Sequence, residues 1–415
     1  MLAAGYLPTN NAWLDSPVES GMQAGFGVYV HVPFCVHRCG YCDFATEAVA
    51  NPADANDLFD RYVTALTSEL TALATGAIDP RLGVTRWPKI TSVFVGGGTP
   101  TILPPQQLAD VIGHVCAVFD VTEGCEITVE CNPETASAPL FDALFAAGVN
   151  RVSFGAQSFT PSVLATLERR HTAGSVPTAV ALARQSGITD ISVDLLYGTP
   201  GETDNDFRHS LERAIALGVT HVSAYALTVH ENTPFGRQVA TGVLPAPDPD
   251  VQRDRFELAQ AVLGAAGFEA YELSNFARGP AYRSAHNTLY WRHGNYLGAG
   301  VGAHSHVNGH RWWATRSTPG YLQAWENASL DAVPFTNWPG RSGYEALDVD
   351  ERALERLMLG LRVAEGIHPH DLPPLSPDAL EEAMRLGLVE TACGRVRSTS
   401  EGWFLLDEAV RVLFV

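Results

Sequence analysis

Three cysteines, Cys35, Cys39 and Cys42, stand in one short segment with the spacing CxxxCxxC. Iron–sulfur clusters are normally held by four cysteine thiolates, so three thiolates with no fourth nearby would leave one iron free to bind another group. The spacing also fits one face of a helix, but Pro33 before it and Gly40 within it disfavour a continuous helix. The segment therefore predicts a loop that binds an iron–sulfur cluster with one open site.

A structural zinc site is the competing interpretation of this loop, with His31 or His37 as the fourth ligand. Four-coordinate zinc sites usually show a second pair of ligands at motif spacing, and this sequence shows none. The remaining cysteines have no metal-binding spacing and are expected to be packing residues. The spacing therefore favours a cluster over zinc.

Downstream of Gly27, short β-branched runs alternate with amphipathic stretches, which predicts βαβ units and a parallel sheet. The expected strands are Val28–Val32, Ile90–Val95, Glu126–Cys131, Arg151–Gln157, Asp190–Tyr197 and His221–Thr228. The expected helices are Leu58–Leu73, Gln106–Phe119, Leu140–Ala147, Val176–Gln185 and Asp206–Leu217. Such units are too few to close an eight-stranded barrel, so we predict an α/β fold built on an open, partial (β/α)6 barrel.

One face of several predicted strands is polar, although parallel strands covered on both faces usually read as continuous apolar runs. Glu126 and Glu130 share such a face on the third strand, and Arg151 and Gln157 on the fourth. Active sites of βα barrels lie at the C-terminal strand ends, which is where Glu130, Gln157 and Asp194 fall and where the cysteine loop opens. The alternative is a buried polar network whose members satisfy one another.

Three glycines, Gly96 to Gly98, close the second expected strand and are followed by Thr99 and Pro100. Glycines at this position let a ligand approach the backbone closely. Together with the cysteine loop, this pattern resembles the radical S-adenosylmethionine superfamily. The resemblance implies a 4Fe-4S cluster whose open iron is chelated by the amino and carboxylate groups of S-adenosylmethionine.

Motifs along most of the chain narrow this resemblance to the oxygen-independent coproporphyrinogen III oxidase group, HemN, and its HemW relatives. The motifs are YVHVPFC from Tyr29, GGGTP from Gly96, VECNP from Val129, SFGAQSF from Ser153 and VDLLYGTP from Val193. By position, the resemblance assigns the cluster to Cys35, Cys39 and Cys42. It assigns S-adenosylmethionine contacts to Tyr29, Tyr41, Gly97, Gly98, Thr99, Glu130, Gln157, Arg169, Asp194 and Ala226, with Arg170 as the alternative to Arg169.

One position of the cluster motif distinguishes the HemN pattern from the HemW pattern. The oxidase carries another cysteine two places beyond its cluster motif, where this chain has Phe44. Phe44 and the HNxxYW tract from His286 to Trp291 resemble the HemW type, which implies heme binding and delivery of heme to an acceptor protein. Oxidative decarboxylation of coproporphyrinogen III by a radical enzyme is the alternative, and a zinc-dependent regulator that uses the C-terminal tail on DNA is a third.

The tract from His286 to Trp313 suits a porphyrin, because aromatic rings offer flat apolar surface and imidazole can ligate heme iron. The candidate iron ligands are His286, His293, His304, His306, His310 and Tyr290, among which we single out His286, Tyr290 and His304. Each histidine can instead be a structural residue held by hydrogen bonds. The tryptophans of the tract can instead form the hydrophobic core of this region.

Four regions are expected along the chain. They are an N-terminal extension (1–26), the partial barrel (27–243), a region containing the HNxxYW tract (251–344) and a winged-helix-like tail (345–415), the last two being mostly α-helical. The tail is expected to contain a β-ribbon that ends in Trp403–Leu406. It carries 14 Asp and Glu against 7 Arg, and this charge disfavours DNA as its partner.

The composition of the 415 residues excludes further classes of function. The net charge of -19, with Lys89 as the only lysine, opposes binding to nucleic acid or to an anionic membrane surface. The unpaired cysteines and the lack of a leader predict a reducing, cytoplasmic compartment. No stretch is long and apolar enough to predict a transmembrane segment, which leaves peripheral contact with a membrane protein open.

Overall fold

The computed structural model describes residues 25–328, 338–368 and 377–414. The first strand begins at Phe26, so the expected N-terminal extension lies almost wholly outside the described residues. None of the helices described is long and apolar enough to cross a membrane.

Parallel strands form the centre of the molecule in the order β1-β4-β5-β6-β7-β8. They are β1 (Phe26–Val32), β4 (Ile90–Gly97), β5 (Val121–Cys131), β6 (Arg151–Gln157), β7 (Asp190–Tyr197) and β8 (His221–Ala226). Neighbouring strands lie in parallel register, with Val30 beside Val95 and Ser153 beside Ser192. In the described sheet β1 and β8 do not pair with each other, so the predicted open barrel is confirmed.

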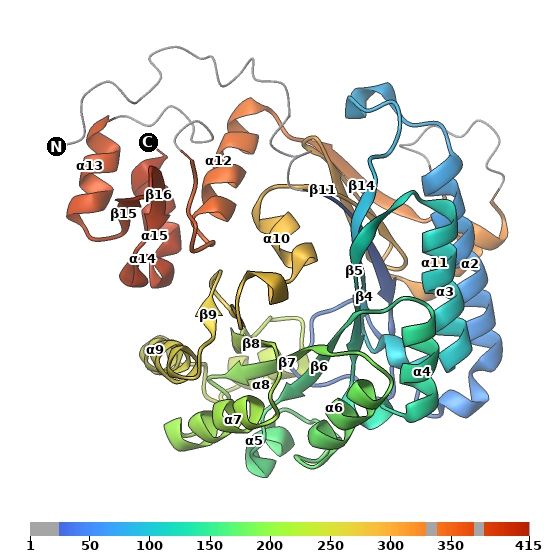
Figure 1. Cartoon of the computed structure of the whole chain (residues 1–415), viewed down its shortest axis with the longest axis horizontal. Helices are drawn as coiled ribbons and strands as arrows, with labels where there is room; N and C mark the ends of the chain where they lie inside the picture. Colours follow the sequence, from blue (N-terminus) through green and yellow to red (C-terminus); the bar gives the residue numbers. More distant parts are fainter. Residues whose placement is uncertain (1–24, 329–337, 369–376, 415) are drawn as a thin grey trace.

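Amphipathic helices cover the convex face of this sheet (Figure 1). They are α2 (Asn56–Thr75), α3 (Pro105–Val118), α4 (Ala138–Ala146), α6 (Ser175–Gln185) and α7 (Asp204–Ala216), with the short helices α5 (Pro161–Thr166) and α8 (Pro234–Ala240) after β6 and β8. The outward side chains of β1, among them Val28 and Val30, are fully buried in the core that these helices complete. Local signals place the helix starts, since Thr203 and Asp206 form a capping box at α7.

The region after the barrel extends the same sheet on both sides. Beside β1 lie β11 (Asn295–Ala299), β12 (His304–Val307), β13 (His310–Ala314) and β14 (Arg341–Ala346), and beside β8 lie β10 (Asn275–Ala277) and β9 (Glu269–Ala270). The connecting helices are α9 (Pro249–Ala265), α10 (Ala285–Trp291) and α11 (Thr318–Glu326). A mostly helical expectation missed these strands, because they are short and form only where the open barrel leaves edges to be covered.

The tail packs around a small apolar core of its own. It contains α12 (Val349–Gly360), α13 (Pro377–Arg385), a ribbon of β15 (Val389–Ala392) and β16 (Arg395–Ser398), α14 (Ser400–Phe404) and α15 (Leu406–Leu413). The expected ribbon is present as β15 and β16, but its predicted end at Trp403–Leu406 is wrong. The ribbon ends at Ser398, because Thr399 caps α14 by accepting a hydrogen bond from the Gly402 N–H. The winged-helix-like arrangement stays a prediction.

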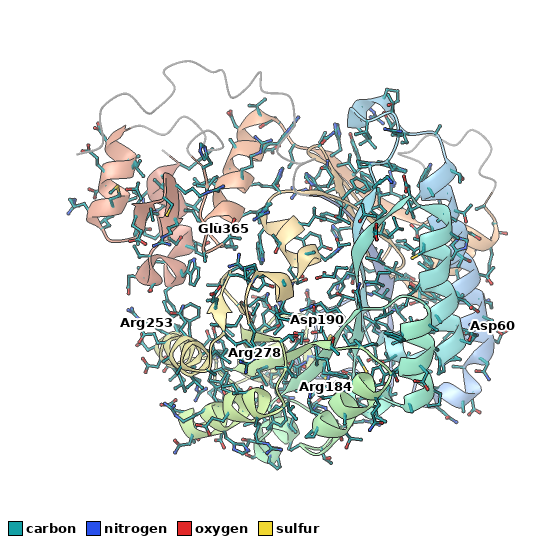
Figure 2. The ribbon with its side chains drawn as sticks, in the orientation of Figure 1. Asp60, Arg184, Asp190, Arg253, Arg278 and Glu365 are labelled. Atoms are coloured by element: carbon teal, nitrogen blue, oxygen red, sulfur yellow. The ribbon has the colours of Figure 1, made fainter. Side chains whose placement is uncertain are left out.

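Ion pairs join the tail to the region that follows the barrel. Arg253 on α9 pairs with Glu401, and Glu365 pairs with Arg283 at 3.3 Å and with Arg292 at 2.8 Å. Arg253 and Glu365 are labelled in Figure 2, where both lie along the border between the two parts. Most of these groups are half exposed, so each pair contributes little stability by itself.

A buried ion pair fixes α9 against the end of β7. Arg255 donates to Glu202 at 2.9 Å, and both side chains are almost fully buried. Glu202 also accepts a hydrogen bond from the Gly198 N–H at 2.8 Å, directly after β7. The neighbouring Gln252 donates to the Leu227 carbonyl at 2.9 Å, so α9 also supports the turn after β8.

We expect Arg255→Ala to destabilise the chain by about 3–5 kcal/mol, because it leaves Glu202 buried without its partner. Urea unfolding of the full chain at pH 8 measures this loss. Arg253→Ala, two residues earlier on the same helix, removes an exposed pair and serves as the control whose midpoint stays close to that of the unchanged chain. Equal midpoints for the two variants would contradict the assignment.

Candidate cofactor site

Cys35 ends the very short strand β2 (Phe34–Cys35), which pairs with β3 (Glu47–Ala48), and Cys39 and Cys42 lie on the loop between these two strands. Within the loop the Cys42 N–H donates to the Cys39 carbonyl at 3.1 Å, and the loop then returns to β3. Burial raises the pKa of the Cys35 thiol to about 11 and also raises that of Cys42. These thiols therefore stay protonated until a metal displaces the proton.

A cavity of about 450 Å³ opens at the C-terminal ends of the barrel strands and reaches the cysteine loop. Its lining brings together Cys35, Cys39, Cys42, Tyr41, Gly97, Gly98, Thr99, Glu130, Gln157, Arg169, Asp194 and Ala226. Tyr29 does not line it, since its ring lies deeper in the barrel, where the hydroxyl bonds to His31 Nδ1 at 2.9 Å. Residues from six strands thus meet at one site.

Two glycines make the close approach of the loop and β4 possible. A Cβ on Gly98 would lie 2.7 Å from the Phe34 carbonyl oxygen and 2.9 Å from the Cys35 sulfur. Gly97 has φ +116°, and a Cβ there would lie 2.5 Å from the His31 ring. The glycines therefore hold the cysteine loop against the end of β4.

Two buried carboxyl groups face the cavity. Glu130 accepts a hydrogen bond from the Gly97 N–H at 3.0 Å, and burial together with the charge of Asp194 raises its pKa to about 8. Asp194 accepts from the Ser153 hydroxyl at 3.0 Å, and burial raises its pKa. Such a pair favours a ligand that brings positive charge and hydroxyl donors, as the amino group and ribose of S-adenosylmethionine would.

Arg169 supplies the opposite charge. Its Nη2 donates to Asn132 Oδ1 at 2.8 Å and to the Gly155 carbonyl at 2.7 Å. Its Nε is buried and has no hydrogen-bond partner within the described part of the chain. That free N–H fits the carboxylate of S-adenosylmethionine. Together with the carboxyl groups of Glu130 and Asp194, which fit the amino group, the site suits both charged groups of the cofactor's amino-acid part.

Gln157 marks the site by its backbone. It has φ +63° at the end of β6, where the register with β7 shifts. A left-handed backbone at a residue other than glycine costs free energy and is typical of functional sites. Asn132 and Tyr225 also line the cavity, although the sequence singled out neither. Both could have been found from the sequence, because Asn132 directly follows β5 and Tyr225 lies near the C-terminal end of β8, where barrel sites form.

The zinc interpretation gains no support from the geometry. Both ring nitrogens of His31 are engaged, with the Tyr29 hydroxyl and the Ala45 carbonyl, and His37 lies 3.7 Å from Glu168. Across residues 25–328, 338–368 and 377–414, no three His, Cys, Asp or Glu side chains converge on the position of one ion. Thiolates that each bind a different iron of a cluster need no such convergence.

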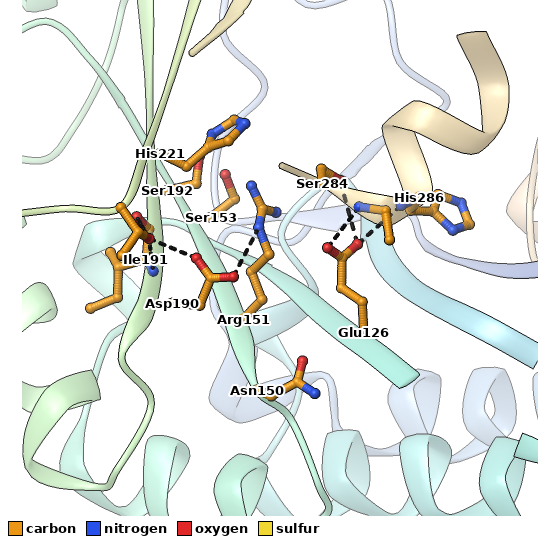
Figure 3. Close-up of polar contacts among 12 residues, drawn as sticks. Glu126, Asn150, Arg151, Ser153, Asp190, Ile191, Ser192, His221, Ser284 and His286 are labelled. Carbon is orange, nitrogen blue, oxygen red and sulfur yellow. Dashed lines mark hydrogen bonds and ion pairs between the residues drawn. The ribbon is translucent and has the colours of Figure 1, made fainter. Parts of the chain in front are cut away.

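The HNxxYW tract forms α10, which lies on the inner side of the curved sheet, opposite α2 and α3 (Figure 1). Glu126 of β5 accepts hydrogen bonds from the backbone N–H groups of Ala285 at 2.8 Å and His286 at 3.1 Å (Figure 3). His286 bonds to the Ser92 hydroxyl through Nδ1 and to the Tyr290 hydroxyl through Nε2, both at 2.9 Å. Helix α10 therefore fills the lower barrel.

Further polar groups of the lower barrel contact one another. Arg151 lies between Glu126 and Asp190 in Figure 3, 3.9 Å from the Asp190 carboxylate. Ser192 bonds to His221 at 2.8 Å. The polar strand face thus has two parts, since Glu130, Gln157 and Asp194 line the cavity as predicted, whereas Glu126 and Arg151 belong to the buried network that was the alternative.

The candidate heme ligands differ in what their rings contact. His293 bonds to Glu355, His306 to the Gly294 carbonyl and His310 to the Tyr344 hydroxyl. His286 is fully buried, and burial lowers its pKa to about 3. His304 is exposed on β12 and stacks on Trp313, with 5.4 Å between ring centroids. The structure thus brings His286 and Tyr290 together but leaves His304 apart from them.

The open barrel, the cysteine loop and the cavity define a radical S-adenosylmethionine protein, and the model of the radical SAM superfamily matches residues 29–214. The heme chaperone HemW of Mycobacterium tuberculosis is 39% identical over 388 residues, which cover 94% of each chain. HemW of Bacillus subtilis is 32% identical and covers 92% of this chain and 97% of its own. The chain belongs to the HemW family.

Coproporphyrinogen III oxidase (HemN) from Escherichia coli has the same fold. The TM-score is 0.75 at 22% sequence identity, and the match covers 97% of this chain and 94% of the oxidase. The predicted partial-barrel fold and the resemblance to the HemN and HemW group are therefore confirmed.

We expect Gly98→Ala to impair cluster binding, because the added Cβ pushes the Phe34 carbonyl and the Cys35 sulfur away from β4. Overpacking of this kind destabilises by about 1–3 kcal/mol. Iron and sulfide content after anaerobic reconstitution measures the loss. Gly113→Ala on α3 is the control, since a Cβ there meets nothing within 4 Å and the helix gains stability. Unchanged iron content in the Gly98 variant would contradict this role.

We expect Glu130→Gln to stabilise the cofactor-free chain more at pH 8 than at pH 5. The pKa of Glu130 rises from 4.5 to about 8 on folding, so its ionisation lowers stability increasingly between these pH values. The amide removes that cost. One pKa unit corresponds to about 1.4 kcal/mol, so the two gains should differ by on the order of 1 kcal/mol or more.

Thermal unfolding at both pH values measures this difference. Glu123→Gln, at the exposed opposite end of β5, is the control and should give the same small effect at both. A pH-independent gain for Glu130→Gln would show that Glu130 is not the group that titrates.

Proposed function

We propose that this chain is a heme chaperone, which binds heme, a 4Fe-4S cluster and S-adenosylmethionine and passes heme to an acceptor protein in the cytoplasm. The observation that carries the proposal is the 39% identity, over 94% of both chains, to a protein described as a heme chaperone. Phe44 supports it, because it stands at the mouth of the cavity, where the oxidase pattern has a further cysteine.

The chain's own residues would hold the cofactors. Cys35, Cys39 and Cys42 would bind three irons of the cluster and leave the fourth open, and Glu130, Asp194 and Arg169 line the same cavity. A reduced cluster supplies an electron to bound S-adenosylmethionine. Arg169 would hold the carboxylate and Glu130 the amino group, so the cofactor is fixed at both ends.

Heme, in this proposal, is bound at the surface and not in the barrel. Among the candidate ligands, His304 is the one whose ring makes no hydrogen bond to a described residue. Its imidazole can therefore bind iron without breaking an existing hydrogen bond. Burial and the nearby Arg311 and Arg316 lower its pKa, which keeps the imidazole in the neutral form that ligates metal. Trp313 offers an aromatic surface, and the arginines suit the propionates.

We expect the purified chain to bind heme in a titration followed by its Soret absorbance, and His304→Ala to weaken this binding about tenfold or more. His310→Ala, on the next strand, is the control with unchanged affinity, because its ring already bonds to Tyr344. His286→Ala should lower stability by about 1–3 kcal/mol through its two lost hydrogen bonds, with unchanged heme affinity of the folded chain.

Absence of heme binding by the unchanged chain would overturn the chaperone proposal. Loss of heme binding in His286→Ala but not in His304→Ala would be consistent with a heme chaperone. It would contradict the assignment of His304 as the iron ligand. An anaerobic assay with coproporphyrinogen III tests the competing activity, and steady formation of protoporphyrinogen would favour the oxidase.

A further inference from the structure

Asn132 follows β5 directly and precedes a 3-10 turn (Pro133–Thr135). Asparagine at the start of such a turn commonly caps it, yet the Asn132 side chain makes no capping hydrogen bond. Its amide points into the cavity and bonds to two other side chains there. The side chain is therefore committed to the site and not to the turn.

The two partners fix which way the amide points. Arg169 can only donate, so the oxygen Oδ1 faces Arg169, at 2.8 Å from Nη2. The Nδ2 group consequently faces Thr99 and donates to its hydroxyl oxygen, also at 2.8 Å. Since Thr99 accepts from Asn132, its own proton is free for another acceptor.

Both partners also reach cluster ligands. The Thr99 hydroxyl donates to the Cys35 sulfur at 3.6 Å, and Arg169 Nη1 donates to the Cys39 sulfur at 3.8 Å. One amide thus connects the donors of two of the three cysteines. Thr99 is buried, so water does not compete for its bond.

We propose that Asn132 is a positioning residue that holds the Thr99 and Arg169 donors on the Cys35 and Cys39 sulfurs and thereby raises the reduction potential of the cluster. Hydrogen bonds to cluster sulfurs and nearby charge set this potential. Reduction adds negative charge, which donors stabilise more in the reduced than in the oxidised cluster. The proposal rests on the cluster of the proposed function.

Two substitutions of Asn132 test its contacts with Thr99 and Arg169. Asn132→Asp keeps an acceptor for Arg169 but turns the Thr99 hydroxyl away from Cys35, because a carboxylate only accepts. Asn132→Leu removes both contacts. We expect the midpoint potential of the reconstituted cluster, followed by electron paramagnetic resonance, to fall in both variants, in Asn132→Asp partly through the added negative charge and in Asn132→Leu through the lost contacts alone.

Thr99→Val and Thr99→Ser provide a test that leaves Asn132 in place. Valine removes the donor to Cys35 and should lower the potential, whereas serine keeps a hydroxyl and should restore it. Asn150→Asp is the matched control, because Asn150, labelled in Figure 3, lies at the opposite end of β5 and β6 from the cavity. Its side chain donates to the Cys125 carbonyl there. Its potential should equal that of the unchanged chain.

Iron and sulfide content separates the two possible failures. An unchanged chain that binds no iron would overturn the cofactor set of the proposed function. Variants that load the cluster at the unchanged potential would overturn the role of Asn132. If Asn132→Leu loads no cluster, the comparison of Thr99→Val with Thr99→Ser decides, and equal potentials would refute the proposal.

Discussion

Charged side chains on the inner face of an open barrel each need a partner, because a buried charge without one is strongly destabilising. In the lower barrel the chain supplies the partners itself. Glu126 binds the first turn of α10, and Arg151 lies between Glu126 and Asp190. In the upper barrel Glu130 and Asp194 repel each other. Under the proposed function, a bound ligand supplies the partner for these two carboxyl groups.

This division explains the place of the HNxxYW tract. Helix α10 forms the floor of the barrel, where His286 packs against Tyr29 and Phe94 with 6.5 and 5.4 Å between ring centroids. A histidine in this position contributes to folding, since both of its ring nitrogens are satisfied within the core. Under the proposed function, the cofactors lie in the cavity at the C-terminal ends of the barrel strands, and heme lies on the edge strands of the sheet, from which it can be passed on.

The regular parts of the chain were predictable because their signals are local. Strand and helix periodicity located the central barrel, and the cysteine spacing located the loop. Strands such as β11 and β12 were missed because they pair only at an edge that the barrel leaves open. The ribbon prediction at Trp403 failed because the cap at Thr399 outweighs the apolar run that follows it.

The sequence by itself determined the chemistry available, because residue types and short spacings are written in it: three close thiols, a glycine turn, and acids at strand ends. Only the tertiary structure decided which polar residues face the cavity and which bond to one another. Glu126 and Glu130 share one strand face, yet Glu126 caps α10, 160 residues along the chain, and Glu130 does not. Such partners come together only through folding, so no local pattern reveals them.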